Sequence, residues 1–226
     1  MSRHEATIAP RPTTWVGIDP GITGSLVALD ESGALVMAER TPLIRGTPDV
    51  AAAAAIFDRL KARGPLFVVC EKPFPNKRGG KIDTGYLSLL ASVKFWESAA
   101  GPRVKFLKVP PVTWQRLVAG VAGVGKAKAI GWCRVFLPSL DLYPGRCEQP
   151  CDALSDAAVM AEYGRRLALA TARTVNAVNA CSGPRPSRAT SPPSARTGRG
   201  TSDGHCILET LAPRSLAPRS LALAST

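Results

Sequence analysis

The fold is decided by residues 13–40, which read TTWVGIDPGITGSLVALDESGALVMAER. Three apolar runs, at 13–19, 24–30 and 34–40, are separated by the short turn-forming stretches PGIT and ESG. Apolar and β-branched runs of this length, bounded by Pro, Gly, Asp or Ser, are typical of β-strands. Because the connections are so short, the three strands are expected to form an antiparallel meander.

Helices and strands alternate after the meander. Helices are expected at 49–63, 84–100, 112–120, 126–137 and 152–169, and strands at 66–70 and 103–109. The run LFVVC at 66–70 is apolar throughout, which is typical of a central strand covered on both faces. The sequence therefore predicts an α/β fold with a mixed five-stranded sheet, three antiparallel meander strands plus two parallel strands, flanked by helices on both faces.

The length of 226 residues suits one domain with tails. We expect a disordered N-terminal tail at 1–12, a domain at 13–170 and a disordered C-terminal tail at 171–226, which is rich in Pro, Ser and Arg and repeats LAPRS. Six scattered cysteines predict neither a disulfide framework nor structural zinc, since His4 and His205 both lie in the tails.

The charge of the chain predicts an anionic partner. It carries 29 Lys and Arg against 17 Asp and Glu, a formal net charge of +12. Eleven of the basic residues but only two acidic residues lie between 72 and 128, where neutralising nucleic-acid phosphates is the simplest use. A solvated basic face that keeps the protein soluble is the alternative. No apolar run is long enough for a membrane span and no secretory signal is visible, so no membrane partner and an intracellular, DNA-associated location are expected. Cytoplasm, nucleoid and organelle are not distinguished.

Four carboxylates are candidates for a catalytic metal site. Asp19 ends the first strand and Glu71 ends the strand at 66–70, so both emerge at one sheet edge if these strands are neighbours. Asp152 and Asp156 lie four residues apart at the start of the last helix, on one face, where like charges repel. Four acids gathered together need cations between them, and hard oxygen ligands suit Mg²⁺ or Mn²⁺. Two such ions about 4 Å apart can clamp a phosphodiester.

Each carboxylate also has a purely structural explanation. Asp152 could cap the last helix, and Asp156 could be favoured by the positive end of the helix dipole. Asp19 precedes Pro-Gly and could be a turn residue, while Glu71 could mark the exit of its strand to solvent. Only the common geometry of all four residues favours a site.

Basic segments near these acids are candidates for DNA binding. The loop 72–83 reads KPFPNKRGGKID, and its candidate contacts are Lys72, Phe74, Lys77, Arg78 and Lys81. Phe74 could wedge against an unstacked base pair, or it could pack on the protein surface.

The segment GVAGVGKA at 120–127 nearly matches a nucleotide-binding P-loop. Ala127 replaces the required hydroxyl residue and no strand precedes the segment, so no nucleotide cofactor is expected. Lys126 and Lys128 instead suit a DNA phosphate at the start of a helix. The four tryptophans lie in apolar patterns that predict packing in the core or a dimer interface: Trp15, Trp96, Trp114 and Trp132.

Four segments together resemble the RuvC-type Holliday junction resolvases of the RNase H-like superfamily. They are GIDPGITG, VVCEKP, WQRLVAGVAGVGKAKA and DALSDAAVMAEYGRR, and they cover about 15–167. PFP after Glu71 and FLPSL before the last helix are similar to the plant chloroplast branch. The resemblance implies an RNase H-like fold and a homodimeric, Mg²⁺-dependent endonuclease that resolves four-way DNA junctions in recombination and repair.

The resemblance also implies roles for the carboxylates. Asp19 would bridge two Mg²⁺ ions, Glu71 would hold one, and Asp152 and Asp156 the other; Mn²⁺ may substitute for Mg²⁺. One ion would present hydroxide to the phosphate and the other would stabilise the departing 3′ oxygen, leaving a 5′ phosphate. Many relatives have a His, or an Asp three residues before the last acid. Here the gap is four, so the division of metal binding between Asp152 and Asp156 stays open.

Other functions fit part of the sequence. IDPGITG also resembles the first phosphate loop of actin-like sugar kinases and ATPases, but no second phosphate loop is evident. An RNase H-like nuclease with another substrate, or a junction-binding protein without catalysis, are the remaining alternatives. Metal-dependent cleavage would exclude the last of these.

Overall fold

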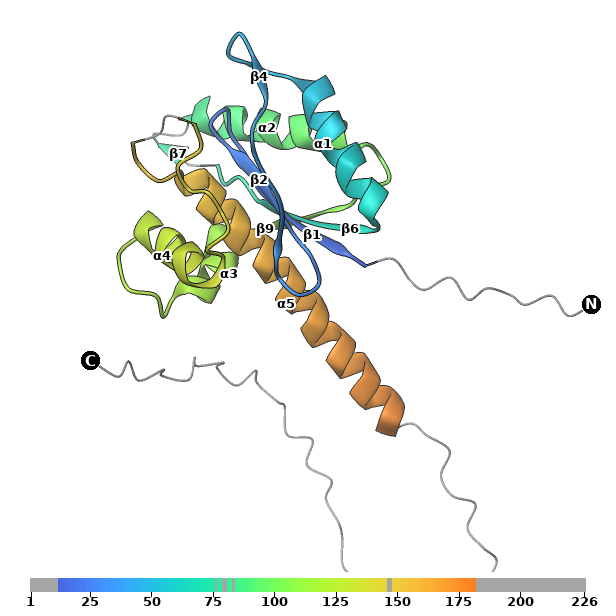
Figure 1. The fold of residues 1–226 in the computed structure, drawn as a ribbon. Helices are drawn as coiled ribbons and strands as arrows, with labels where there is room; N and C mark the ends of the chain where they lie inside the picture. Colours follow the sequence, from blue (N-terminus) through green and yellow to red (C-terminus); the bar gives the residue numbers. More distant parts are fainter. Residues whose placement is uncertain (1–11, 76, 79–80, 83, 146–147, 182–226) are drawn as a thin grey trace, which may run out of the picture. The chain divides into compact units, whose positions relative to one another are not determined.

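The computed structural model describes residues 12–75, 77–78, 81–82, 84–145 and 148–181 (Figure 1). The chain divides after Asn176 into two units, and the second is described only as the end of the last helix. Both predicted tails therefore lie largely outside the described residues.

The predicted mixed sheet is present, with the strand order β3-β2-β1-β6-β9. Its strands are β1 (Thr14–Asp19), β2 (Ser25–Leu29), β3 (Leu35–Arg40), β6 (Leu66–Glu71) and β9 (Phe106–Val109). β2 pairs antiparallel with both β1 and β3, whereas β6 pairs parallel with both β1 and β9. The prediction of a mixed five-stranded sheet, three meander strands plus two parallel strands, is confirmed.

Helices cover both faces of the sheet, as the alternation of apolar residues requires (Figure 1). α1 (Val50–Arg63) and α2 (Thr84–Ala100) share one buried cluster with Val16, Ile18 and Val68 of the strands. The opposite cluster contains Val27 and Val69 and is covered by α3 (Pro111–Trp114), the 3-10 helix η1 (Gln115–Val118), α4 (Lys126–Phe136) and α5 (Asp152–Cys181). Successive strand residues point to opposite faces, so each strand contributes to both clusters.

Two short hairpins were not predicted. β4 (Leu43–Ile44) pairs with β5 (Thr47–Pro48), and β7 (Lys77–Arg78) pairs with β8 (Lys81–Ile82) inside the basic loop. Gly46, with φ of 78°, supplies the left-handed conformation that the first of these turns needs.

The helix predicted at 112–120 is present, but it is shorter and only partly α-helical. The segment forms a single turn of α-helix, α3, which Pro111 starts at a position where a missing N–H is tolerated. It continues as η1 and ends before Gly120. Glycine-rich sequence beyond that point disfavours further helix.

The last helix is longer than predicted. It was expected to end at about 169, with a disordered tail from 171, but α5 continues to Cys181. Residues 171–181 contain neither Pro nor Gly and include several Ala, so nothing in them breaks a helix that is already formed. Among the helices of the described ranges, none combines the length and hydropathy that crossing a membrane requires.

Ion pairs around the buried Glu162 connect α5 to the turn between β2 and β3. Glu162 is 4% exposed and accepts hydrogen bonds from Arg165 Nε (2.7 Å), Arg165 Nη2 (3.0 Å) and Arg166 Nε (2.6 Å). Arg165 also donates to the backbone oxygen of Glu31, in the turn between β2 and β3, at 3.1 Å. Burial raises the pKa of Glu162, but the hydrogen bonds from the two arginines outweigh it and hold that pKa below its ordinary value of 4.5.

Replacing this carboxylate should therefore destabilise the fold in a pH-dependent way. Glu162→Gln is expected to lower the free energy of unfolding by about 1–3 kcal/mol at neutral pH. Because the folded pKa is depressed, the loss is fully present above the unfolded pKa and disappears as pH falls through the folded value. Urea denaturation of both proteins at neutral and acidic pH measures this. The control is Glu39→Gln, which removes the exposed pair with Arg59 and should cost under about 1 kcal/mol. A Glu162→Gln deficit that does not change with pH would contradict the ion-pair explanation.

Candidate active site

Asp19 and Glu71 leave neighbouring strands at the same edge of the sheet. β1 and β6 run parallel, and Ile18 pairs with Cys70. Asp19 and Glu71 are the next residues of their strands, so the two carboxylates emerge side by side. The predicted neighbourhood of the two strand ends is confirmed.

α5 brings its acidic first turns to this edge because it packs directly against β1. A Cβ atom on Gly17 would collide with the backbone of Ala157 and Ala161, so only glycine allows this approach. The contact lies one residue from Asp156 along the helix, and Gly17 lies two residues from Asp19 along the strand. Asp156 is therefore placed near the strand ends by backbone contact rather than by its own side chain.

Three of the four predicted carboxylates line one cavity of about 700 Å³: Asp19, Glu71 and Asp156. The rest of its wall comes from α3 and η1, including Trp114 and Arg116, and from the start of α4 with Lys126 and Lys128. Acidic ligands and basic residues therefore face one space, which is the arrangement that a phosphate held on metal ions would need.

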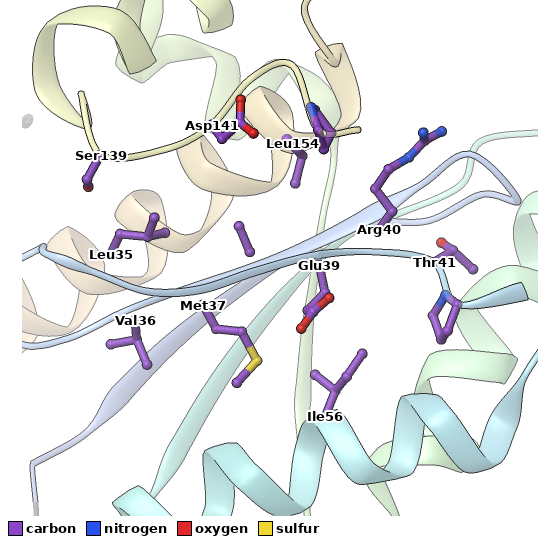
Figure 2. Close-up of a pocket in the computed structure, with 13 residues that line it drawn as sticks. Leu35, Val36, Met37, Glu39, Arg40, Thr41, Ile56, Ser139, Asp141 and Leu154 are labelled. Carbon is purple, nitrogen blue, oxygen red and sulfur yellow. The ribbon is translucent and has the colours of Figure 1, made fainter. Parts of the chain in front are cut away.

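Another cavity, of about 690 Å³, lies along the edge strand β3 (Figure 2). Figure 2 shows Ile56 of α1 on one side of β3, and Asp141 and Leu154 on the other. None of its lining residues is a predicted site residue, although its volume is similar. The predicted site residues that line a cavity therefore belong to the one at the strand ends.

The carboxylates of the site carry negative charge that the protein only partly compensates. Burial, followed by repulsion from Asp156, Glu71 and Asp152, raises the pKa of Asp19 to about 8. Burial, followed by Glu71 and Asp152, likewise raises the pKa of Asp156 to about 7. Lys126 opposes both shifts without cancelling them. Groups that lose their charge when crowded together in this way are typical of functional sites.

Asp152 differs from the other three. Its side chain forms an ion pair with Lys126, and it does not line the cavity. The hydrogen bond from Lys126 lowers the pKa of Asp152, and the same bond raises the pKa of Lys126. The structure thus separates two acids that the sequence could not rank: Asp156 faces the cavity, while Asp152 is neutralised at its rim.

The donor set fits a hard divalent cation in chemistry, since every candidate ligand atom is a carboxylate oxygen. The side chains are not converged on one point, however. In the part of the chain that the structure describes, no group of three or more His, Cys, Asp or Glu residues is arranged to hold a metal ion. Binding an ion here would require these carboxylates to approach one another.

The predicted DNA contacts are distributed over two elements. Lys72 lies over the ring of Phe74, with Nζ 5.9 Å from the ring centroid, and Phe74 is 54% exposed. Lys128 lines the cavity and donates to the backbone oxygen of Ala119 at 3.3 Å. Lys126 lines the cavity too but contacts Asp152. The side chains of the remaining candidates lie outside the described residues: Lys77, Arg78 and Lys81.

Trp114 is a site residue that the sequence did not reveal. Its burial was predicted, and it is 2% exposed. Its indole Nε1, however, donates a hydrogen bond to Glu71 Oε2 at 3.2 Å. The two residues are far apart in the chain, and the only sequence signal was that Trp114 closely follows the strand beside that of Glu71.

Similarity to known proteins is low. RuvC of Thermus thermophilus in complex with a Holliday junction substrate matches with a TM-score of 0.44 and 21% identity, over 66% of this chain and 90% of that one. A further structure of RuvC from the same organism matches with a TM-score of 0.42, at the same identity and coverage. No family model matches the chain. No curated protein matches it either. Similarity at this level leaves the function to be inferred from the site.

Proposed function

We propose that this protein is a metal-dependent DNA endonuclease that resolves four-way junctions. The observation that carries the proposal is that one cavity is lined by three acids and two lysines: Asp19, Glu71, Asp156, Lys126 and Lys128. Acids able to hold a cation and bases able to hold a phosphate meet there, on a chain with a net charge of +12. The RuvC-like motifs of the sequence point to the same reaction.

The proposed cofactor is Mg²⁺, two ions per site, with Mn²⁺ as a substitute. Asp19, Glu71 and Asp156 would hold the ions through carboxylate oxygens, and Asp152 would join them by releasing Lys126. Bound ions would supply Lewis-acid stabilisation and a hydroxide nucleophile at neutral pH. Burial, and after it repulsion between the acids, raises the pKa values of Asp19 and Asp156, and a bound cation would offset both effects by favouring the charged carboxylates.

The chain's own basic groups would position the DNA. Arg116, Lys126 and Lys128 line the cavity and would bind phosphate oxygens next to the scissile bond. Phe74, exposed beside Glu71 and flanked by Lys72, would contact an unstacked base at the branch point. Paired cuts across a junction require two sites, so the active form proposed is a homodimer. A role in recombination and repair, in a bacterial or an organelle nucleoid, follows from that substrate, and the plant chloroplast type remains part of the proposal.

A labelled four-way junction tests the reaction directly. With Mg²⁺ the protein is expected to nick opposing strands in pairs, whereas with EDTA it should bind the junction without cutting it. A linear duplex of the same sequence is the control and should stay intact. Equal cutting of the duplex would indicate an RNase H-like nuclease of another specificity. Junction binding without nicks in either Mg²⁺ or Mn²⁺ would indicate a binding protein without catalysis.

A further inference from the structure

Trp114 contacts a proposed metal ligand from inside the core. It ends α3, is 2% exposed, and donates from Nε1 to Glu71 Oε2 at 3.2 Å. It also lines the cavity that holds Glu71, Asp19 and Asp156. The indole therefore lies between the hydrophobic cluster beneath the site and the carboxylate at its surface.

This hydrogen bond is not a general feature of the buried tryptophans. Trp15 and Trp96 are also buried, at 8% and 0% exposure, and within the described residues their Nε1 atoms have no hydrogen-bond partner. The fold therefore tolerates an unpaired indole N–H in its core, yet the one beside the strand ends is directed at Glu71. A specific contact at that point indicates a role in the site.

The backbone holds the two partners in fixed register. Glu71 pairs with Val109 at the end of β9, and the N–H of Lys72 donates to the Val109 oxygen at 2.8 Å. Pro110 and Pro111 follow immediately and lead into α3 with restricted backbone angles. The Trp114 indole thus has little freedom to move relative to the Glu71 backbone.

We propose that Trp114 is a positioning residue that holds the Glu71 carboxylate in the orientation for binding a divalent cation. The inference rests on the proposed function, in which Glu71 is a metal ligand. The indole N–H donates to Oε2 and so limits rotation of a flexible carboxylate side chain. Outer partners of this kind commonly change metal affinity by about 10–100-fold, because they remove the cost of ordering the ligand.

The substitution Trp114→Phe keeps an aromatic ring and removes the N–H. Its expected effect is a dissociation constant for Mg²⁺, measured by calorimetry on the full chain, about 10–100-fold higher than that of the unmodified protein. Cleavage should fall at limiting Mg²⁺ and recover at high Mg²⁺, while the KM for the junction stays unchanged. Trp96→Phe is the matched control: it removes a buried, unpaired indole from the opposite cluster and should leave the Mg²⁺ affinity unchanged.

A second measurement does not depend on folding of the Trp114 variant. The chain has four Trp, so its indole N–H groups give four resonances in a ¹H–¹⁵N NMR spectrum. That of Trp114 is assigned by elimination with Phe variants of Trp15, Trp96 and Trp132. Adding Mg²⁺ is expected to shift the Trp114 resonance in the unmodified protein but not in Glu71→Gln.

The possible outcomes distinguish a failure of the positioning role from a failure of the proposed nuclease function. An unmodified protein that does not bind Mg²⁺ would overturn both. Normal binding in the unmodified protein, combined with an unchanged Mg²⁺ affinity in folded Trp114→Phe or an unshifted Trp114 resonance, would overturn only the positioning role.

Discussion

Asp19→Asn is expected to abolish strand cleavage and to leave junction binding intact. Asp19 lines the acidic cavity and ends β1, which pairs with the strand that carries Glu71 and contacts the helix that carries Asp156. Asparagine has the same shape but no charge, so it cannot neutralise a divalent cation. Several kcal/mol of transition-state stabilisation would be lost, which corresponds to a rate reduction of at least about a thousandfold. A cleavage assay on the labelled junction tests the loss of activity, and a gel-shift assay tests whether junction binding is retained.

The variant should also fold normally. Removing Asp19, which three other carboxylates repel, relieves charge crowding, so the melting temperature is expected to be unchanged or higher. Asp58→Asn removes an exposed carboxylate that pairs with Lys61 on the surface of α1, and it controls for the change in net charge. Wild-type cleavage by Asp19→Asn would refute the metal site. Loss of junction binding by the folded variant would mean that Asp19 acts in DNA binding instead.

Gly17→Ala is expected to cause the largest loss of stability. The added Cβ would collide with the carbonyl oxygen of Ala157 and the N–H of Ala161, both backbone atoms of α5. A flexible side chain could move aside, but a helix backbone must shift as a unit. The expected cost is at least about 3 kcal/mol. Because typical domains are stable by only about 5–15 kcal/mol, much of the protein would unfold or aggregate on expression.

The control for this change is Gly46→Ala, which adds the same methyl group where nothing lies within 4 Å. Its backbone has φ of 78°, so it should cost only about 1–2 kcal/mol of conformational strain. Urea denaturation measures the free energy of unfolding of both variants, Gly17→Ala and Gly46→Ala. Folded Gly17→Ala protein should in addition bind Mg²⁺ weakly, because the shift of α5 would move Asp156 away from Asp19. Equal stability losses at Gly17 and Gly46 would contradict the close contact between β1 and α5.

Most strands and helices of the fold could be predicted from local sequence patterns. The apolar runs of the meander and the buried strand at 66–70 have lengths and boundaries that local sequence defines, and their strands appear within a few residues of the prediction. The errors occurred where local signals were ambiguous. Pro111 and the glycines after Val118 shortened one expected helix. The stretch after 170 has no Pro or Gly before residue 183, so α5 continues through it to Cys181.

The sequence by itself determined that Asp19 and Glu71 each end an apolar strand. The parallel pairing of β1 with β6 in the folded protein then brings these two residues to one sheet edge. Only the tertiary structure decided how the acids differ. It directs Asp156 into the cavity, pairs Asp152 with Lys126, and brings Trp114 to Glu71. These contacts join side chains distant along the chain, and packing of α3, α4 and α5 creates them. The spacing of apolar residues indicates which face of a strand or helix is buried, but it does not indicate which polar atoms form hydrogen bonds across the buried interface.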